Sequence, residues 1–222
     1  STQGYSSAAS DVYKRQKLGC LNERTIAVHC VALSDRDIEL LAESGASVVH
    51  CPVSNMRLGC GASPVVKLLK AGINVALGTD GAASACSLSM FEQMRTAGLI
   101  AKGFSQDPTE LTVNQIIRMA TINGANALKL HCDAGSLAVG KLADLAVIDM
   151  SQLVTMPVLD VLSNVIYAVE AQCVHQVWVS GSLVANIQQE KLLRPDRGKL
   201  LTKSNIMSWQ NRVCEILRDD FN

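Results

Sequence analysis

The chain has 222 residues, of which 48% are hydrophobic, and its 20 Lys and Arg balance its 20 Asp and Glu. This is enough for one large domain, or a domain and a half, around a substantial core. A net charge of zero gives no reason to expect nucleic acid or a membrane surface as a partner, so we predict a small-molecule partner.

The eight cysteines form no Cys-x-x-Cys pair, which argues against a zinc ribbon or a redox motif. Unpaired cysteines of this kind behave as small buried hydrophobes, which favours a reducing compartment. We find no signal peptide and no apolar run of about 18 residues. The sequence therefore predicts a cytoplasmic protein.

Residues 1–16 are small and polar and lack the periodicity of the rest of the chain. Their ending, "DVYKRQ", resembles translated adapter sequence. We predict that this segment is a foreign or disordered leader and that the folded part begins at Lys17. A natural disordered tail is the alternative.

Three short apolar runs follow: "TIAVHC", "ASVVHC" and "INVALGTD". Each ends in a side chain that can bind a metal or move a proton: His29, His50 and Asp80. Continuous apolar runs separated by helical patterns favour parallel strands covered by helices. Because no G-x-G-x-x-G turn is present, a barrel is favoured over a dinucleotide-binding sheet. At the C-terminal strand ends of a barrel, the three side chains would face one site.

The connecting segments predict two short helices. In the first, Ser34 and Asp37 form a capping box and Gly45 ends the helix. In the second, Ser63 is the N-cap, Pro64 is the first helical residue, and the helix stops at Gly72.

The rest of the chain predicts two longer helices and a change of pattern. The helices cover about residues 87–102 and 113–130, the second capped by Thr112. From 136 to 188, short strands broken by Gly turns predict a mostly β domain with a hairpin at 180–182. Residues 192–222 read as a basic segment followed by a helix.

Zinc takes imidazole nitrogen and carboxylate oxygen, and a catalytic site keeps one position open for water. The acidified water can then be deprotonated by a nearby Asp. His29 and Asp80 have the side chains that this chemistry needs. From these residues alone, a core histidine and a turn aspartate remain an equal alternative.

The segments "AVHC", "HCPVSN", "LGTDGAAS", "MATINGANALKL" and "GSLAVGKLADLAVIDM" resemble, in this order, the amidohydrolase superfamily. The resemblance is to its methylthioadenosine/S-adenosylhomocysteine deaminase group and the triazine and guanine hydrolase relatives, over residues 17 to about 190. It implies an α/β fold: the C-terminal part of a (β/α)8 TIM barrel, strands six to eight, plus a small β-sandwich domain. We divide the chain into a leader (1–16), barrel (17–134), β domain (135–190) and helical tail (191–222).

Carried over by motif, the resemblance implies a role for each site residue. His29 hydrogen-bonds the attacking water or the tetrahedral centre, and Asp80 is a metal ligand and general base. His50, Ser54 and Asn55 line the substrate pocket, although a structural role for His50 is the stronger alternative. We expect Cys30 and Cys51, which follow the two histidines, to point away from the site and serve packing.

The family's other metal ligands, an H-x-H pair and a later His, are not found in this sequence. Among its four histidines, His131 and His175 lie in the wrong segments to replace them. We therefore expect a C-terminal fragment that carries one of four metal ligands. Alone, it should neither bind zinc stoichiometrically nor turn over substrate. A natural half-barrel that pairs with a separate chain is a minor alternative.

The resemblance implies a zinc-dependent enzyme that deaminates a purine-like N-heterocycle, such as methylthioadenosine or S-adenosylhomocysteine, through a metal-activated water. Guanine or chlorotriazine hydrolysis is the alternative, and a homo-oligomer is expected for the full-length parent. The deaminases with H-x-E and P-C-x-x-C motifs are excluded, as are hydrolases with a G-x-S-x-G elbow, because neither signature occurs.

Overall fold

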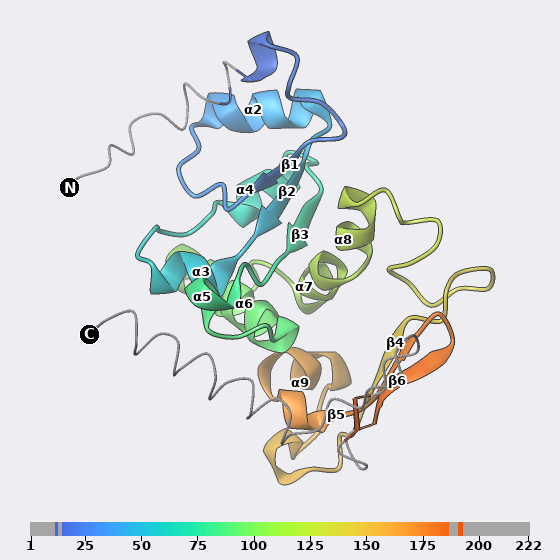
Figure 1. The fold of residues 1–222 in the computed structure, drawn as a ribbon. Helices are drawn as coiled ribbons and strands as arrows, with labels where there is room; N and C mark the ends of the chain where they lie inside the picture. Colours follow the sequence, from blue (N-terminus) through green and yellow to red (C-terminus); the bar gives the residue numbers. More distant parts are fainter. Residues whose placement is uncertain (1–11, 13–14, 187–190, 193–222) are drawn as a thin grey trace, which may run out of the picture.

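The computed structural model describes residues 12, 15–186 and 191–192, so the predicted C-terminal helix and most of the predicted leader lie outside the described residues. Figure 1 shows a small twisted sheet surrounded by helices and, beside it, a second sheet built from the later part of the chain. The molecule is of mixed α/β type, as the sequence predicts.

The first sheet is parallel and has the strand order β1-β2-β3. Its register places Val28 beside Val49 and His50 beside Leu77. The predicted parallel strands are therefore confirmed, and their C-terminal ends lie along one edge of the sheet. The strands are β1 (Ile26–Val28), β2 (Ser47–His50) and β3 (Val75–Leu77).

Helix α2 (Asp35–Ser44) has the predicted ends: the capping box of Ser34 and Asp37, and Gly45 in the left-handed conformation. Helix α4 (Val65–Lys70) differs from the prediction, because it begins one residue late with Pro64 in the cap position. The backbone carbonyl of Ser63, not its hydroxyl, accepts from the Val65 amide at 2.8 Å.

Three helices lie near the C-terminal strand ends. The short helix α3 (Pro52–Arg57), which the sequence analysis did not predict, follows β2 directly. The one-turn helix α5 (Ala82–Ala85) follows β3 after a short link. Helix α6 (Met90–Ser105), predicted for about 87–102, begins at the cap Ser89.

The helix predicted for 113–130 is two helices, α7 (Val113–Ala120) and α8 (Ile122–Ala127), and only the Thr112 cap is as expected. Beyond the break at Thr121, helix α8 is bonded to the sheet region. The Nδ2 atom of Asn123 donates to the Val75 carbonyl at 2.8 Å. The backbone carbonyl of Asn123 accepts from Nδ2 of Asn74 at 3.0 Å. The break thus lets α8 bond to β3, which a straight helix would not.

The second sheet is antiparallel, and the predicted hairpin at 180–182 joins β5 to β6. The segment is less purely β than expected, because α9 (Val161–Tyr167) lies between β4 and β5 and packs on α6 and α7. The domain boundaries remain a prediction. The remaining elements are β4 (Leu145–Ile148), η1 (Leu153–Thr155), η2 (Ala171–Cys173), β5 (Val174–Val179), β6 (Ser182–Asn186) and β7 (Lys191–Leu192).

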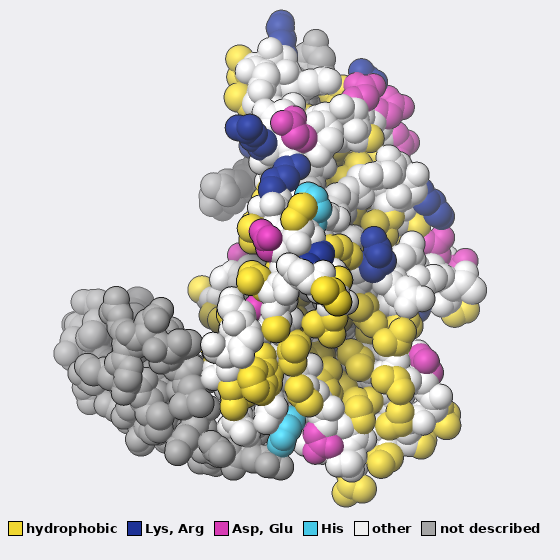
Figure 2. Space-filling view, turned by 90° about the vertical axis from the view of Figure 1, so that its right-hand side faces the viewer, with side chains coloured by type: hydrophobic (Ala, Val, Ile, Leu, Met, Phe, Trp, Pro, Cys, Tyr) yellow, Lys and Arg dark blue, Asp and Glu magenta, His cyan; other side chains and the backbone are white. Residues whose placement is uncertain are grey.

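The core lies between the parallel sheet and its helices. Figure 2 shows that charged side chains gather near α2 at the top of one face, whereas hydrophobic side chains gather over the lower half. No helix in the described part of the chain is long and apolar enough to cross a membrane. The side chains that anchor the core include Leu40, Leu41, Val48, Leu68, Val75, Ile116 and Met119.

Candidate functional site

His29 and Asp80 follow the ends of β1 and β3, and both adopt a left-handed backbone, with φ of 71° and 59°. Residues other than glycine take this conformation at a cost, and such strain is often found at functional sites. Figure 1 shows the ends of β2 and β3 directed at α3 and α5. The candidate site is therefore the group of side chains between these strand ends and these two short helices.

The Asp80 carboxylate is held by three donors. Its Oδ2 accepts from the Ser54 hydroxyl at 2.5 Å and from the Ser84 hydroxyl at 2.9 Å. Its Oδ1 accepts from the Gly81 amide at 2.7 Å. Hydrogen bonds to an ionised acceptor are short and strong, so the orientation of this carboxylate is well defined.

These donors also set the charge of Asp80. The Ser54 hydroxyl contributes most, followed by the Gly81 amide and the Ser84 hydroxyl, and together they lower the pKa of Asp80 to about 2. Donors stabilise the charged form of a carboxyl group and disfavour the protonated form. Asp80 is therefore an anion throughout the neutral range, the form in which a carboxylate binds a metal.

His29 is oriented by Asn55, whose Oδ1 lies 2.9 Å from the Nδ1 atom of the imidazole. Because an amide oxygen only accepts, the Nδ1 atom carries the proton in this pair. In the neutral form of the ring, the Nε2 atom is then the acceptor for water or substrate. Asn55 thus selects the tautomer of His29 with its proton on Nδ1.

Helix α3 supplies the partners of both candidate catalytic residues. Ser54 and Asn55 are adjacent, at 0% and 1% exposure, so their side chains have little freedom to turn away. One bonds to Asp80 and the other to His29. The structure thus places two of the three predicted pocket residues against the predicted catalytic pair.

His50 belongs to neither pair. Its side chain is 1% exposed, lines a cavity of about 290 Å3 with residues of α4 and α6, and its Nδ1 has no partner among the described residues. Burial, with a smaller contribution from His29, lowers the pKa of His50 to about 4, so the imidazole is neutral. The role of His50, in the pocket or structural, therefore remains a prediction.

The two cysteines are packed, as expected for structural residues. Cys51 is 2% exposed, and burial, followed by the Asp80 charge, raises its pKa to about 11. It does not point away from the β3 end, because a Cβ at Gly78 would lie 3.2 Å from its Sγ. Cys30 packs against the core, and burial raises its pKa to about 11 as well. Neither thiol is a thiolate at neutral pH.

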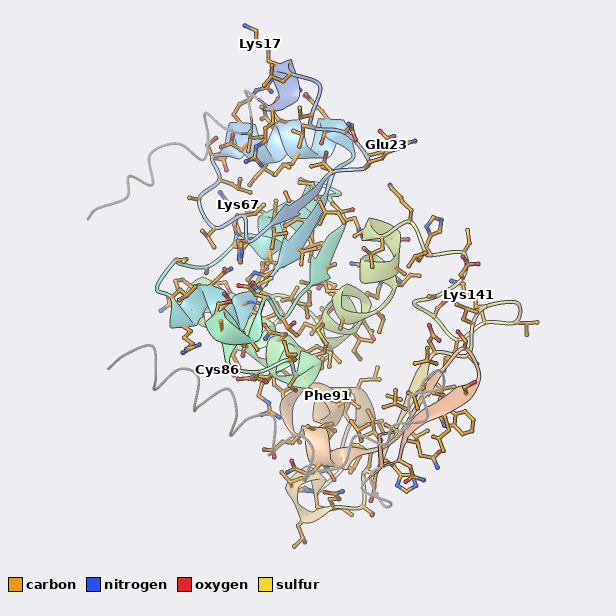
Figure 3. The ribbon with its side chains drawn as sticks, in the orientation of Figure 1. Lys17, Glu23, Lys67, Cys86, Phe91 and Lys141 are labelled. Carbon is orange, nitrogen blue, oxygen red and sulfur yellow. The ribbon has the colours of Figure 1, made fainter. Side chains whose placement is uncertain are left out.

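Two residues that support Asp80 were not predicted from the sequence. Ser84 bonds to the carboxylate, and Arg57, the last residue of α3, donates from one guanidinium nitrogen to the carbonyls of Ala83 and Ser84. Figure 3 labels Cys86, which follows this turn of α5. The i, i+4 spacing of Asp80 and Ser84 could have indicated their contact. Nothing in the sequence indicates the contact between Arg57 and α5.

Asp80 has the chemistry of one zinc ligand, since it is an ionised oxygen donor that is open to solvent. A complete zinc site needs three or more protein ligands. Within the described residues there is no group of three His, Cys, Asp or Glu that could hold a metal ion. The described residues therefore do not form a metal site by themselves.

The chain belongs to the amidohydrolase family, whose model matches residues 3–184. The match begins inside segment 1–16, so the origin of that segment stays a prediction. Comparison with solved structures supports the same fold. An adenosine deaminase from Xanthomonas campestris with bound zinc aligns with a TM-score of 0.82 at 40% identity, covering 92% of this chain and 46% of that one.

Two further similarities bear on chemistry. A 5-methylthioadenosine/S-adenosylhomocysteine deaminase from Moorella thermoacetica is 46% identical over 176 residues, which cover 79% of this chain and 41% of that protein. The zinc complex of an atrazine chlorohydrolase from Arthrobacter aurescens TC1 aligns with a TM-score of 0.72 at 26% identity, covering 83% and 40%. The chain spans less than half the length of each of these proteins.

Proposed function

We propose that the protein hydrolytically deaminates a purine-like N-heterocycle, such as methylthioadenosine or S-adenosylhomocysteine. The observation that carries the proposal is the pair of buried side chains on α3, which orient the Asp80 carboxylate and the His29 imidazole at neighbouring strand ends. The similarity to the Moorella deaminase supports the substrate class. We also propose that β1 to β3 are barrel strands six to eight and that the antiparallel sheet belongs to a small β-sandwich.

In this reaction a water oxygen adds to the amino-bearing ring carbon, and ammonia leaves. His29, with its proton on Nδ1, accepts at Nε2 from the incoming water or from a donor on the ring. Asp80 is ionised and accepts a proton during the addition. It then passes this proton on to the leaving amine.

Zinc is the proposed cofactor of the whole protein, where it would acidify the attacking water, and Asp80 is the only ligand we propose from this chain. Because the described residues do not complete a metal site, we expect the 222-residue chain alone to bind zinc weakly and to release no ammonia. Stoichiometric zinc in metal analysis of the purified chain would contradict this expectation.

The experiment that tests the proposed function places this chain within a longer deaminase. In a chimera of the Moorella deaminase, the 176 matched residues are replaced by those of this chain. We expect this exchange chimera to bind zinc and to release ammonia from methylthioadenosine, measured with a coupled ammonia assay. A folded, zinc-loaded chimera that acts on none of the purine nucleosides would contradict the proposal.

The second candidate is hydrolysis of a chlorotriazine, which the similarity to the atrazine chlorohydrolase favours. The same addition step would then expel chloride rather than ammonia. Chloride release from atrazine by the exchange chimera, without deamination of a nucleoside or of guanine, would support it. A cytoplasmic location and a homo-oligomer of the longer protein remain proposals.

A further inference from the structure

Helix α5 comprises one turn, Ala82–Ala85, directly after the Gly81 that follows Asp80. A single turn fixes several backbone dihedrals for one or two hydrogen bonds and does not persist on its own. It must therefore be held by groups outside it. Asp80 holds its first end, through Oδ1 to the Gly81 amide and through Oδ2 to the Ser84 hydroxyl.

Arg57 holds the other end of the turn. One guanidinium nitrogen donates to the Ala83 carbonyl at 3.1 Å and to the Ser84 carbonyl at 2.8 Å. The last carbonyls of a helix have no partner within the helix, and a basic side chain can satisfy them. Arg57 and Asp80 thus form hydrogen bonds with opposite ends of α5.

These contacts form a continuous link from α3 to the carboxylate. Arg57 fixes the backbone of Ser84, and the Ser84 hydroxyl is one of two donors on Oδ2 of Asp80. The other donor, Ser54, comes from the same helix as Arg57. Because both hydroxyls occupy Oδ2, the remaining lone pair of the carboxylate lies on Oδ1.

The environment of Arg57 differs from that of an ordinary surface arginine. Arg36 is exposed on α2 and pairs with Glu39 and Glu43 of its own helix. Arg57 is also exposed, but its bonds go to backbone atoms 26 and 27 residues away. Contacts of that kind fix one segment relative to another.

We propose that Arg57 is a positioning residue for the Asp80 carboxylate and acts through α5 and the Ser84 hydroxyl. Its effect on turnover rests on the proposed deaminase function, whereas its effect on the carboxylate does not. Without Arg57, α5 loosens and Ser84 leaves Oδ2, so the carboxylate keeps only the donors Ser54 and Gly81 and its orientation is less restricted.

The first test uses the 222-residue chain and the 13C chemical shift of the Asp80 carboxyl carbon at neutral pH. Ser84→Ala should move this signal. Arg57→Gln should move it in the same direction, and the double variant should move it no further than Ser84→Ala alone. Arg36→Gln, the same change on another exposed arginine, should leave it in place. An unmoved signal in Arg57→Gln, or additive shifts in the double variant, would overturn the proposal.

Arg57→Lys keeps a cation that can reach the same carbonyls and should restore the signal. This variant keeps the proposal testable if Arg57→Gln fails to fold, which thermal unfolding and the Trp178 indole signal would reveal. A folded Lys variant whose signal moves in the direction opposite to that of Ser84→Ala would count against the proposal.

The second test measures turnover in the exchange chimera. There, Arg57→Gln should lower kcat about tenfold with little change in KM, because the carboxylate is misplaced while binding is kept. Arg57→Lys should recover most of the loss. An inactive chimera with the expected carboxyl shifts would reject the proposed function alone. An active chimera whose kcat is unchanged by Arg57→Gln would reject the positioning role alone.

Discussion

The two edges of the parallel sheet differ in how they are covered. At the β3 edge, Val75, Ala76 and Leu77 are 0%, 1% and 8% exposed, beneath α7 and α8. At the β1 edge, Ile26 and Val28 are 37% and 48% exposed. Buried apolar area is the main stabilising contribution in a sheet, so among the described residues the β3 edge is the better covered of the two.

The candidate catalytic residues follow the same division. Asp80, after β3, is fixed by three hydrogen bonds from three different residues. His29, after β1, relies on the single contact with Asn55. The described residues therefore determine the orientation of the carboxylate more fully than that of the imidazole.

The largest expected effect is on the β3 side. In the exchange chimera, Asp80→Asn keeps the shape of the side chain but removes the charge and the proton acceptor. We expect kcat to fall about a thousandfold, within the range for loss of an acid-base group. Asp133→Asn, the same change at an exposed site whose side chain has no hydrogen-bond partner among the described residues, is the matched control. Retained turnover in Asp80→Asn would place the chemistry elsewhere.

The next largest expected effect is on stability, and it comes from His50 on the central strand. The pKa of its buried imidazole is lowered from 6.5 to about 4. Between these values the unfolded chain binds a proton that the folded chain does not, so stability falls as the pH falls from 6.5 to 4. The loss should reach about 3 kcal/mol near pH 4 and level off below it.

The measurement is urea unfolding of the 222-residue chain at several pH values between 4 and 7. His50→Gln is neutral throughout and should show a flatter dependence than the parent chain. Parallel curves for His50→Gln and the parent would contradict the burial of a neutral imidazole.

The coverage of the two edges can be tested with one substitution at two positions. Val75→Ala removes buried methyl groups and leaves a cavity, and should lower the free energy of unfolding by about 2 kcal/mol. Val28→Ala, the same change at 48% exposure, should cost less than about 0.5 kcal/mol. Equal losses, measured by urea unfolding, would show that the two edges are equally buried.

The accuracy of the sequence predictions depended on where each signal lay. The parallel strands and the caps at Ser34, Gly45 and Thr112 were predictable, because hydrophobic patterning and helix capping depend on residues that are close in the sequence. The break at Thr121 was not predicted, and beyond it Asn123 bonds to the distant strand β3. Tertiary contacts of this kind override local helical preference.

The site shows the same limit. His29 and Asp80 could be located because strand ends carry function, and Ser54 and Asn55 because their motif resembles a family. Their pairing, Ser54 with Asp80 and Asn55 with His29, spans 26 residues in each case and needed the structure. The contacts of Arg57 could not be predicted from the sequence, since its partners are backbone atoms rather than charged side chains.

The smallest predicted effect concerns the single contact on the β1 side. Asn55→Leu removes the acceptor that holds the Nδ1 proton of His29, so the imidazole should rotate and exchange tautomers. In the 222-residue chain, the 15N shifts of His29 should move from values typical of the Nδ1–H form towards an average of the two forms. In the exchange chimera, kcat should fall about tenfold.

Asn55→Asp is the control, because it keeps an acceptor for the Nδ1 proton and should preserve both the tautomer and most of the turnover. If Asn55→Leu left the 15N shifts unchanged, His29 would be oriented by something other than Asn55. The β1 side would then be as firmly determined as the β3 side, and the difference between the two edges would not extend to the candidate catalytic residues.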